Sequence, residues 1–212
     1  MEKLINKINQ IAKNNAYQLN ELMQLAQIDN YYIAGGCFQK QINDYDLFPT
    51  HKNDFDNVVY KLHNHIVFIS KNSITVKYKD LTVQFCSYYH DSLKNLVESF
   101  DYAHCQIGAK INCYVQVSEI YYSQNYLDWK LTDDDFYVGT EYPLSSLIRS
   151  FKYKENFLKN NFKKEVLKIL TDIIKRGFKD YEDFKNQLDA IDLAYVGESN
   201  ECLELFNLLK KN

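Results

Sequence analysis

Glycine, proline and arginine are all scarce in this chain of 212 residues, which contains six, two and two of them. With so little glycine and proline, the sequence shows no low-complexity segment. Its five cysteines are scattered without CxxC spacing, which argues against a zinc site and against a disulfide framework. No apolar run is long enough to cross a bilayer, and the first ten residues do not form a signal peptide. The sequence therefore predicts a cytoplasmic protein with no membrane contact.

Charge and hydrophobicity narrow the class further. The net charge of −3 excludes a chain that binds nucleic acid over its whole surface. Apolar residues make up 46% of the sequence, enough for a proper core. At this length we expect one domain with an appendage or two small domains.

Hydrophobic periodicity predicts a mixed α/β (α+β) arrangement around one sheet in the first half of the chain. Residues 2–28 and 53–64 have helical spacing, a short helix is expected at 36–42, and another helix at 91–99. Strands are expected at 31–34, 45–49, 66–70, 73–78 and 81–87. A further hairpin is expected from 102–107 and 110–117, turning at Gly108-Ala109. We assign residues 1–117 to this domain.

The remaining chain differs in character. Residues 118–142 are aromatic and acidic and are interpreted as a connecting segment with short helical pieces, in which the run Asp133–Asp135 is solvated surface. Residues 143–212 are predicted to form a C-terminal helical domain, with helices at 144–158, 162–176, 180–190 and 199–211.

One stretch, residues 31–48, combines two features that favour a functional site. A short apolar strand ends at Gly35-Gly36, where the backbone must turn tightly or approach a ligand closely. Asp44 and Asp46 begin the next strand, and alternate residues of a strand point to the same side. Two carboxylates held together repel each other, and a divalent cation relieves that repulsion. The alternative is a plain turn followed by an acidic strand end.

The pattern of a glycine pair, a short helix and DhDhh resembles the signature of the DNA polymerase β-like nucleotidyltransferase superfamily. The resemblance implies that Gly35 and Gly36 lie near a nucleoside triphosphate and that Asp44 and Asp46 hold two magnesium ions. Lys40, one turn along the short helix, either reaches a phosphate or stays in solvent. Through residues 99–102 and 147–153 the chain also resembles small nucleotidyltransferase-like proteins of bacterial viruses.

The same resemblance implies a third carboxylate on a later strand. Residues 81–85 have the form expected for that strand, but the polar residue there is Gln84, which is neutral. Asp101, before the next strand, is the nearest acidic alternative for a metal ligand, unless it simply ends a loop. Without a third carboxylate the protein would be a nucleotide-binding or interaction protein of viral origin that keeps the fold and has lost catalysis.

Basic residues concentrate in the helical region. Between 143 and 179 there are ten Lys or Arg residues against three acids, a local charge of +7. This region is either a solvated face or a phosphate-facing surface for RNA or for the triphosphate, in which Arg149 and Lys152 are candidate contacts. The favoured function is metal-dependent transfer of a nucleoside monophosphate from an NTP such as ATP to an acceptor. An RNA end is preferred over a protein or a small molecule, and the oligomeric state stays open.

Overall fold

A computed structural model describes residues 17–38, 45–70, 72–155 and 158–189. The expected positions of Lys40, Asp44 and the helix at 199–211 lie outside the described residues. The chain divides into two compact units, residues 1–130 and 131–212. The first unit extends past the domain boundary expected at 117.

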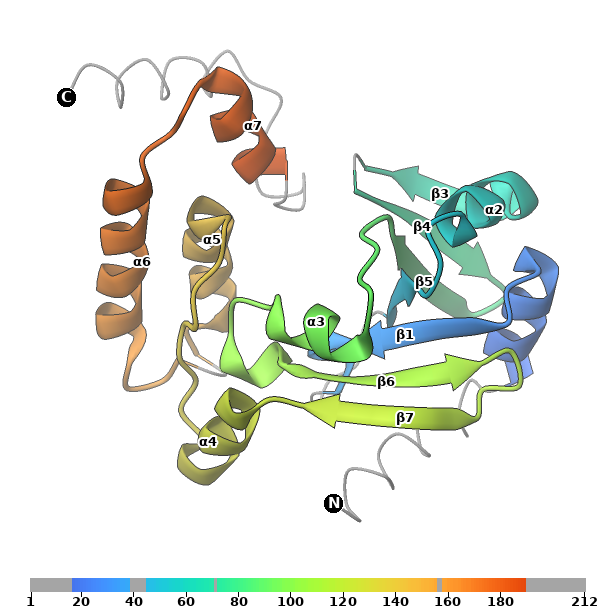
Figure 1. Cartoon of the computed structure of the whole chain (residues 1–212), viewed down its shortest axis with the longest axis horizontal. Coiled ribbons are helices and arrows are strands. Elements are labelled where there is room, and N and C mark those ends of the chain that lie inside the picture. Colours follow the sequence, from blue (N-terminus) through green and yellow to red (C-terminus); the bar gives the residue numbers. More distant parts are fainter. Residues whose placement is uncertain (1–16, 39–44, 71, 156–157, 190–212) are drawn as a thin grey trace. The chain divides into compact units, whose positions relative to one another are not determined.

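The first unit is built on one mixed sheet (Figure 1). In its described part seven strands lie in the order β3-β4-β5-β2-β1-β6-β7. Their bounds are Asn30–Ala34 (β1), Tyr45–Pro49 (β2), Ile66–Ile69 (β3), Ser73–Tyr78 (β4), Leu81–Cys86 (β5), Ile107–Asn112 (β6) and Val117–Tyr122 (β7). β2 and β5 pair in parallel, and the other neighbours pair antiparallel. The predicted fold class, a mixed sheet flanked by helices and followed by a helical region, is confirmed.

Helices cover both faces of this sheet. The face that carries Tyr32, Ala34 and Phe48 packs against Leu96 and Val97 of helix α3 (Leu93–Glu98). α3 begins at Ser92, whose Oγ accepts a hydrogen bond from the Asn95 N–H at 3.1 Å. The opposite face carries the buried alternate residues and is accompanied by helical residues 17–26 and by α2 (Asp54–Lys61). The face under α3 is the one that positions the candidate site.

The prediction of a hairpin that turns at Gly108-Ala109 was wrong. Both residues lie inside β6, and the chain turns after Asn112 instead, where the Asn112 Oδ1 accepts the N–H groups of Tyr114 and Gln116 at 3.0 and 2.9 Å. Gly108 serves packing: a Cβ there would lie 3.0 Å from side-chain atoms of its neighbours Ala34, Leu93 and Val97. A glycine that looked like a turn residue therefore allows α3 to approach the sheet closely.

Residues 118–130, the first part of the expected connecting segment, fall in the first compact unit, and residues 131–142 fall in the second. Residues 118–122 complete β7, the edge strand beside β6, and helix α4 follows at Gln124–Thr132. Trp129 of α4 is 4% exposed, and its ring lies 5.9 Å from that of His104. This aromatic contact packs the Trp129 end of the segment into the core of the first unit.

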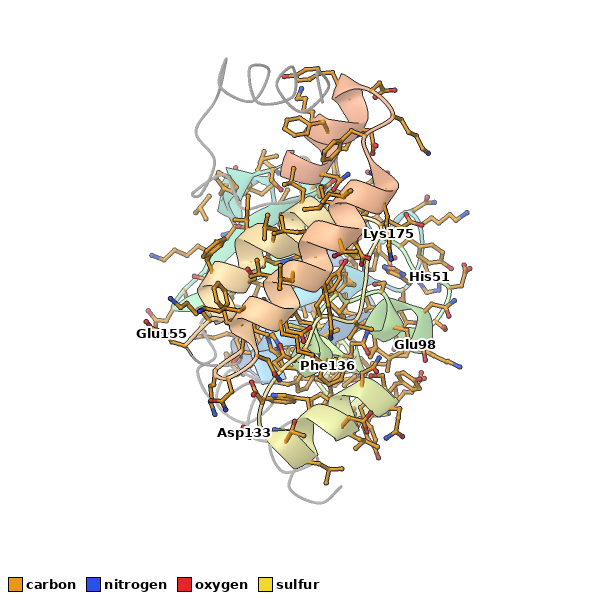
Figure 2. The ribbon with its side chains drawn as sticks, turned by 90° about the vertical axis from the view of Figure 1, so that its left-hand side faces the viewer. His51, Glu98, Asp133, Phe136, Glu155 and Lys175 are labelled. Atoms are coloured by element: carbon orange, nitrogen blue, oxygen red, sulfur yellow. The ribbon has the colours of Figure 1, made fainter. Side chains whose placement is uncertain are left out.

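The second unit contains helices α5 (Pro143–Tyr153), α6 (Phe162–Arg176) and α7 (Tyr181–Asp189). α6 ends at Gly177, which has φ +63° and donates its N–H to the Ile173 carbonyl at 2.9 Å. The expectation of a solvated acidic run before these helices was wrong for Asp135, which is 0% exposed, although Asp133 is exposed and pairs with Lys159 at 2.7 Å. Figure 2 looks onto α5 and α6 and labels Lys175 near the end of α6.

None of the helices in the described ranges has both the length and the apolar composition that a membrane crossing requires.

Candidate active site

The glycine pair lies where β1 ends. Gly35 is buried and has φ +86°, a conformation that side chains other than glycine rarely adopt. A Cβ on Gly35 would lie 3.3 Å from the Phe100 Cζ, so the ring of Phe100 closes over this turn. Gly36, the second residue of the short 3-10 helix η1 (Gly35–Phe38), is exposed, and a Cβ there would meet nothing within 4 Å. The turn is therefore tight at Gly35 and open to a ligand at Gly36.

Asp46 lies on the face of the sheet that α3 covers. Its neighbours Tyr45 and Leu47 are buried on the opposite face, whereas Asp46 is half-buried and shares its side with Phe48. β2 runs beside β1, so Asp46 starts its strand next to the end of β1 that carries Gly35. The strand geometry thus brings the glycine turn and this aspartate to the same region of one face.

Cys86 gives independent support for this placement. Burial raises the pKa of the Cys86 thiol well above its ordinary value, and the nearby Asp46 carboxylate raises it further. Cys86 packs against the same cluster as Phe48. Cys86 and Asp46 therefore lie near each other under the edge of α3.

Gln84 occupies the position beside Asp46. The two residues are direct Cα partners in the parallel pair of β2 and β5, so their side chains leave the same face. The Gln84 Nε2 donates to the Ser73 Oγ on β4 at 2.9 Å. Sequence analysis identified Gln84 but not its partner Ser73, because the contact between them depends on the register between β4 and β5.

Asp101, the acidic alternative, is 5% exposed in the bend between α3 and the 3-10 helix η3 (Ala103–Cys105). It directly follows Phe100, the residue whose ring covers Gly35. Across the residues that the structure describes, no three His, Cys, Asp or Glu side chains come close enough to hold a metal ion. Asp101 as a metal ligand stays a prediction, as does Asp44.

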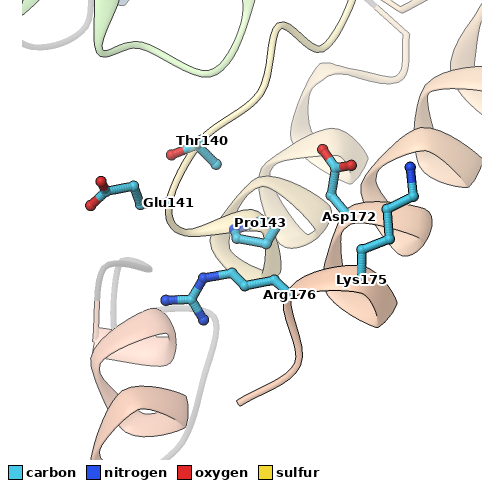
Figure 3. Close-up of a pocket in the computed structure, with 6 residues that line it drawn as sticks. All are labelled: Thr140, Glu141, Pro143, Asp172, Lys175 and Arg176. Atoms are coloured by element: carbon cyan, nitrogen blue, oxygen red, sulfur yellow. The ribbon is translucent and has the colours of Figure 1, made fainter. Parts of the chain in front are cut away.

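The candidate basic contacts lie in the second unit. Arg149 is half-buried on α5, and Lys152 lies one turn later on the same helix. A depression of about 430 Å³ in this unit is lined by Thr140, Glu141, Pro143, Asp172, Lys175 and Arg176 (Figure 3). Arg176 makes two hydrogen bonds of 2.9 Å to the Asp183 carboxylate, which lowers the pKa of that carboxyl. With acids and bases mixed along its wall, this depression has no single charge to offer a ligand.

Comparison with known families shows to which family the chain belongs. Residues 2–128 match the model of the Gabija anti-defense 2 family. The chain belongs to this family. The match includes the glycine turn, Asp46, Gln84 and Asp101, whereas Arg149 and Lys152 lie beyond it. No curated protein matches the sequence.

Solved structures with a similar fold include CCA-adding enzymes. The enzyme of Bacillus stearothermophilus in complex with CTP matches with a TM-score of 0.54 and 12% identity, over 84% of this chain and 49% of that one. The Thermotoga maritima enzyme complexed with tRNA matches with a TM-score of 0.52 and 8% identity, over 98% of this chain and 54% of that one. The chain spans about half the length of these enzymes, and at such identity the likeness shows the fold alone.

Proposed function

We propose that the protein is a metal-dependent nucleotidyltransferase that moves a nucleoside monophosphate from an NTP to an acceptor. The observation that carries the proposal is the juxtaposition of the open glycine turn and Asp46 on one face of a mixed sheet. In a sheet of this type, a turn that frees backbone N–H groups suits phosphates, and a carboxylate beside it suits a hard cation.

The residues fit magnesium by their chemistry. Asp46 offers a carboxylate, and Gln84 beside it carries a neutral oxygen, both of the donor class that magnesium prefers. Asp46, with Asp44 and Asp101, would hold the two ions, and bound magnesium would activate the attacking oxygen and stabilise the leaving pyrophosphate. The N–H groups at Gly35 and Gly36 would receive the triphosphate. Lys40 would add a positive charge there.

The family name gives the biological setting. A protein of the Gabija anti-defense 2 family is proposed to act against the Gabija defence, as expected for a protein of bacterial viruses. The acceptor we favour is an RNA end, because the two similar enzymes have CTP and tRNA in their descriptions and because residues 143–179 carry a charge of +7. Arg149 and Lys152 would contact that RNA. With a protein or small-molecule acceptor, these two residues would have no RNA to contact.

A second function is favoured by one observation, the neutral Gln84 at the Cα partner position of Asp46. A site with fewer carboxylates would hold its cations less tightly and would favour binding of a nucleotide over its transfer. The protein would then counter the defence by binding a nucleotide or a partner.

Transfer of label separates the two functions. The protein is incubated with each α-labelled NTP, magnesium and either total cellular RNA or protein lysate, and the label that enters macromolecules is measured. We expect label in RNA from the unaltered chain and loss of at least about a hundredfold in the double variant Asp44→Asn, Asp46→Asn, since both would lose ligands of the reaction's cations. The double variant should unfold at the same or a higher temperature, because a repulsion between like charges is relieved.

Variants of the basic helix α5 test whether RNA is the acceptor. Arg149→Ala with Lys152→Ala should weaken RNA retention and flatten its dependence on salt, because fewer counterions are released. Label in protein, together with no RNA retention at low salt, would reject the RNA acceptor. NTP binding that needs Asp46 but yields no label in any acceptor would favour the second function.

A further inference from the structure

A chain of three polar side chains holds the amide of Gln84. The Gln84 Nε2 donates to the Ser73 Oγ at 2.9 Å, and the Ser73 and Ser70 hydroxyls lie 2.8 Å apart. The Ser70 Oγ donates in turn to the Ser73 carbonyl oxygen at 3.1 Å. Ser73 is 7% exposed, so its hydroxyl depends on these partners.

All of these hydrogen bonds can form together with only one assignment of donors and acceptors. Each hydroxyl has one proton. If Ser70 gives its proton to the carbonyl, Ser73 must give its own to Ser70, and the Ser73 oxygen is then an acceptor for the Gln84 N–H. With the amide reversed, the Ser73 proton would go to the Gln84 oxygen, and Ser70 could no longer bond both the carbonyl and the Ser73 hydroxyl. The full network therefore selects the orientation in which the nitrogen faces Ser73.

This orientation leaves the Gln84 Oε1 on the other branch of the amide. β5 lies between β4, which carries Ser73, and β2, which carries Asp46. Asp46 and Gln84 are Cα partners on adjacent strands, about 4.8 Å apart in a sheet. An amide oxygen and a carboxylate that leave the same face of adjacent strands are both of the donor type that a divalent cation binds.

We propose that Gln84 is an oxygen ligand of the divalent cation at Asp46, and that Ser73 and Ser70 hold its carbonyl toward that cation. The inference rests on the proposed nucleotide site but not on transfer itself. Gln84 offers a neutral oxygen in place of a third carboxylate. The protein alone therefore attracts the cation less strongly than a site with a third negative charge would. The cation then enters with the triphosphate, whose oxygens complete its charge and its coordination.

Manganese binding tests the ligand role without any reaction. Mn²⁺ binding to the full chain is measured by electron paramagnetic resonance, with and without a non-hydrolysable NTP. We expect Gln84→Leu and Ser73→Ala each to weaken Mn²⁺ binding about tenfold, the scale seen when a partner that orients a ligand is lost. Gln84→Glu should strengthen binding and make it less dependent on the nucleotide. Thr75→Val is the matched control, because Thr75 is the Cα partner of Gln84 on β4 but has no part in the chain of hydroxyls, and it should change nothing.

The outcomes are decisive for the inference and separate from those of the proposed function. Unchanged Mn²⁺ binding in Gln84→Leu, beside loss in Asp46→Asn, would overturn the ligand role while leaving the site in place. If Gln84→Leu fails to fold, Gln84→Glu decides, and a failure to gain affinity would count against the proposal. Mn²⁺ binding that depends on Gln84 in a chain with no transfer would support the ligand role and reject the enzyme.

Discussion

The two units use buried polar groups in opposite ways. In the first, the polar chain of Ser70, Ser73 and Gln84 lies on a half-open face beside Asp46, next to an apolar cluster under α3. In the second, Glu165 is 0% exposed and accepts the Tyr137 N–H at 2.9 Å as well as the Lys168 ammonium, fastening a loop to α6. Polar groups that face outward can meet a ligand, whereas those that tie backbone together contribute to stability. Acidic residues should therefore affect chemistry in one unit and folding in the other.

Replacing Glu165 should give the largest stability effect of the second unit. Glu165→Ala removes the acceptor of a buried N–H and the partner of Lys168, and we expect a loss of about 2–3 kcal/mol in the free energy of unfolding. Urea unfolding measures this loss, and transfer by the folded fraction should stay unchanged. Glu155→Ala, at an exposed position in the same unit, is the control and should change little. A large loss of transfer with stability intact would break the division between the units.

Glycines with positive φ provide a second contrast. Gly35→Ala should cost about 1–2 kcal/mol for the strained conformation, and it should also weaken NTP binding because the new Cβ would push Phe100. Gly177→Ala, also at positive φ but with open space around it, should lower stability and leave NTP binding alone. Thermal unfolding and NTP titration measure both properties, and equal effects of the two strained positions on NTP binding would remove the contrast.

The smallest effect is expected from the ion pair between Arg176 and Asp183. Hydrogen bonds from Arg176 lower the pKa of the Asp183 carboxyl, so the stability it contributes is present above the unfolded pKa and is lost as pH falls through the lower folded pKa. Asp183→Asn should cost about 1 kcal/mol or less at pH 7, a value typical of partly exposed pairs, and still less at pH 3. Urea unfolding at the two pH values measures the difference, and a cost that grows on acidification would contradict this sign.

Much of the fold follows from the sequence because alternation and helical spacing are local signals. The strands at 31–34, 45–49, 73–78 and 81–86 and the helix at 162–176 were all predicted within a residue or two. Gly108 misled because a glycine needed for close packing and a glycine needed for a turn look alike along the chain. Residues 118–122 were missed as a strand because their extended conformation depends on pairing with β6, which no local pattern reveals.

The candidate site was predictable in part for the same reason. The glycine turn and the face of Asp46 follow from strand geometry, and Gln84 was identified from the form of its strand. Its partner Ser73 could not be inferred, because the contact depends on the register between β4 and β5. Glu165 and Asp135 looked like ordinary surface acids, since one lies in a lysine-rich helix and the other in an acidic run, and only the tertiary structure buries them.

The parallel pairing of β2 and β5 also constrains the order of folding. Among the described strands, this pair alone cannot be joined by a tight turn, and the chain passes through α2, β3 and β4 before it returns. Contacts so distant along the chain form slowly, because the intervening loop must close before they repay its entropy. We therefore expect Asp46 and Gln84 to meet after β4 and β5 have formed their local hairpin. A newly made chain would thus gain its cation site late, when most of the surrounding sheet already exists.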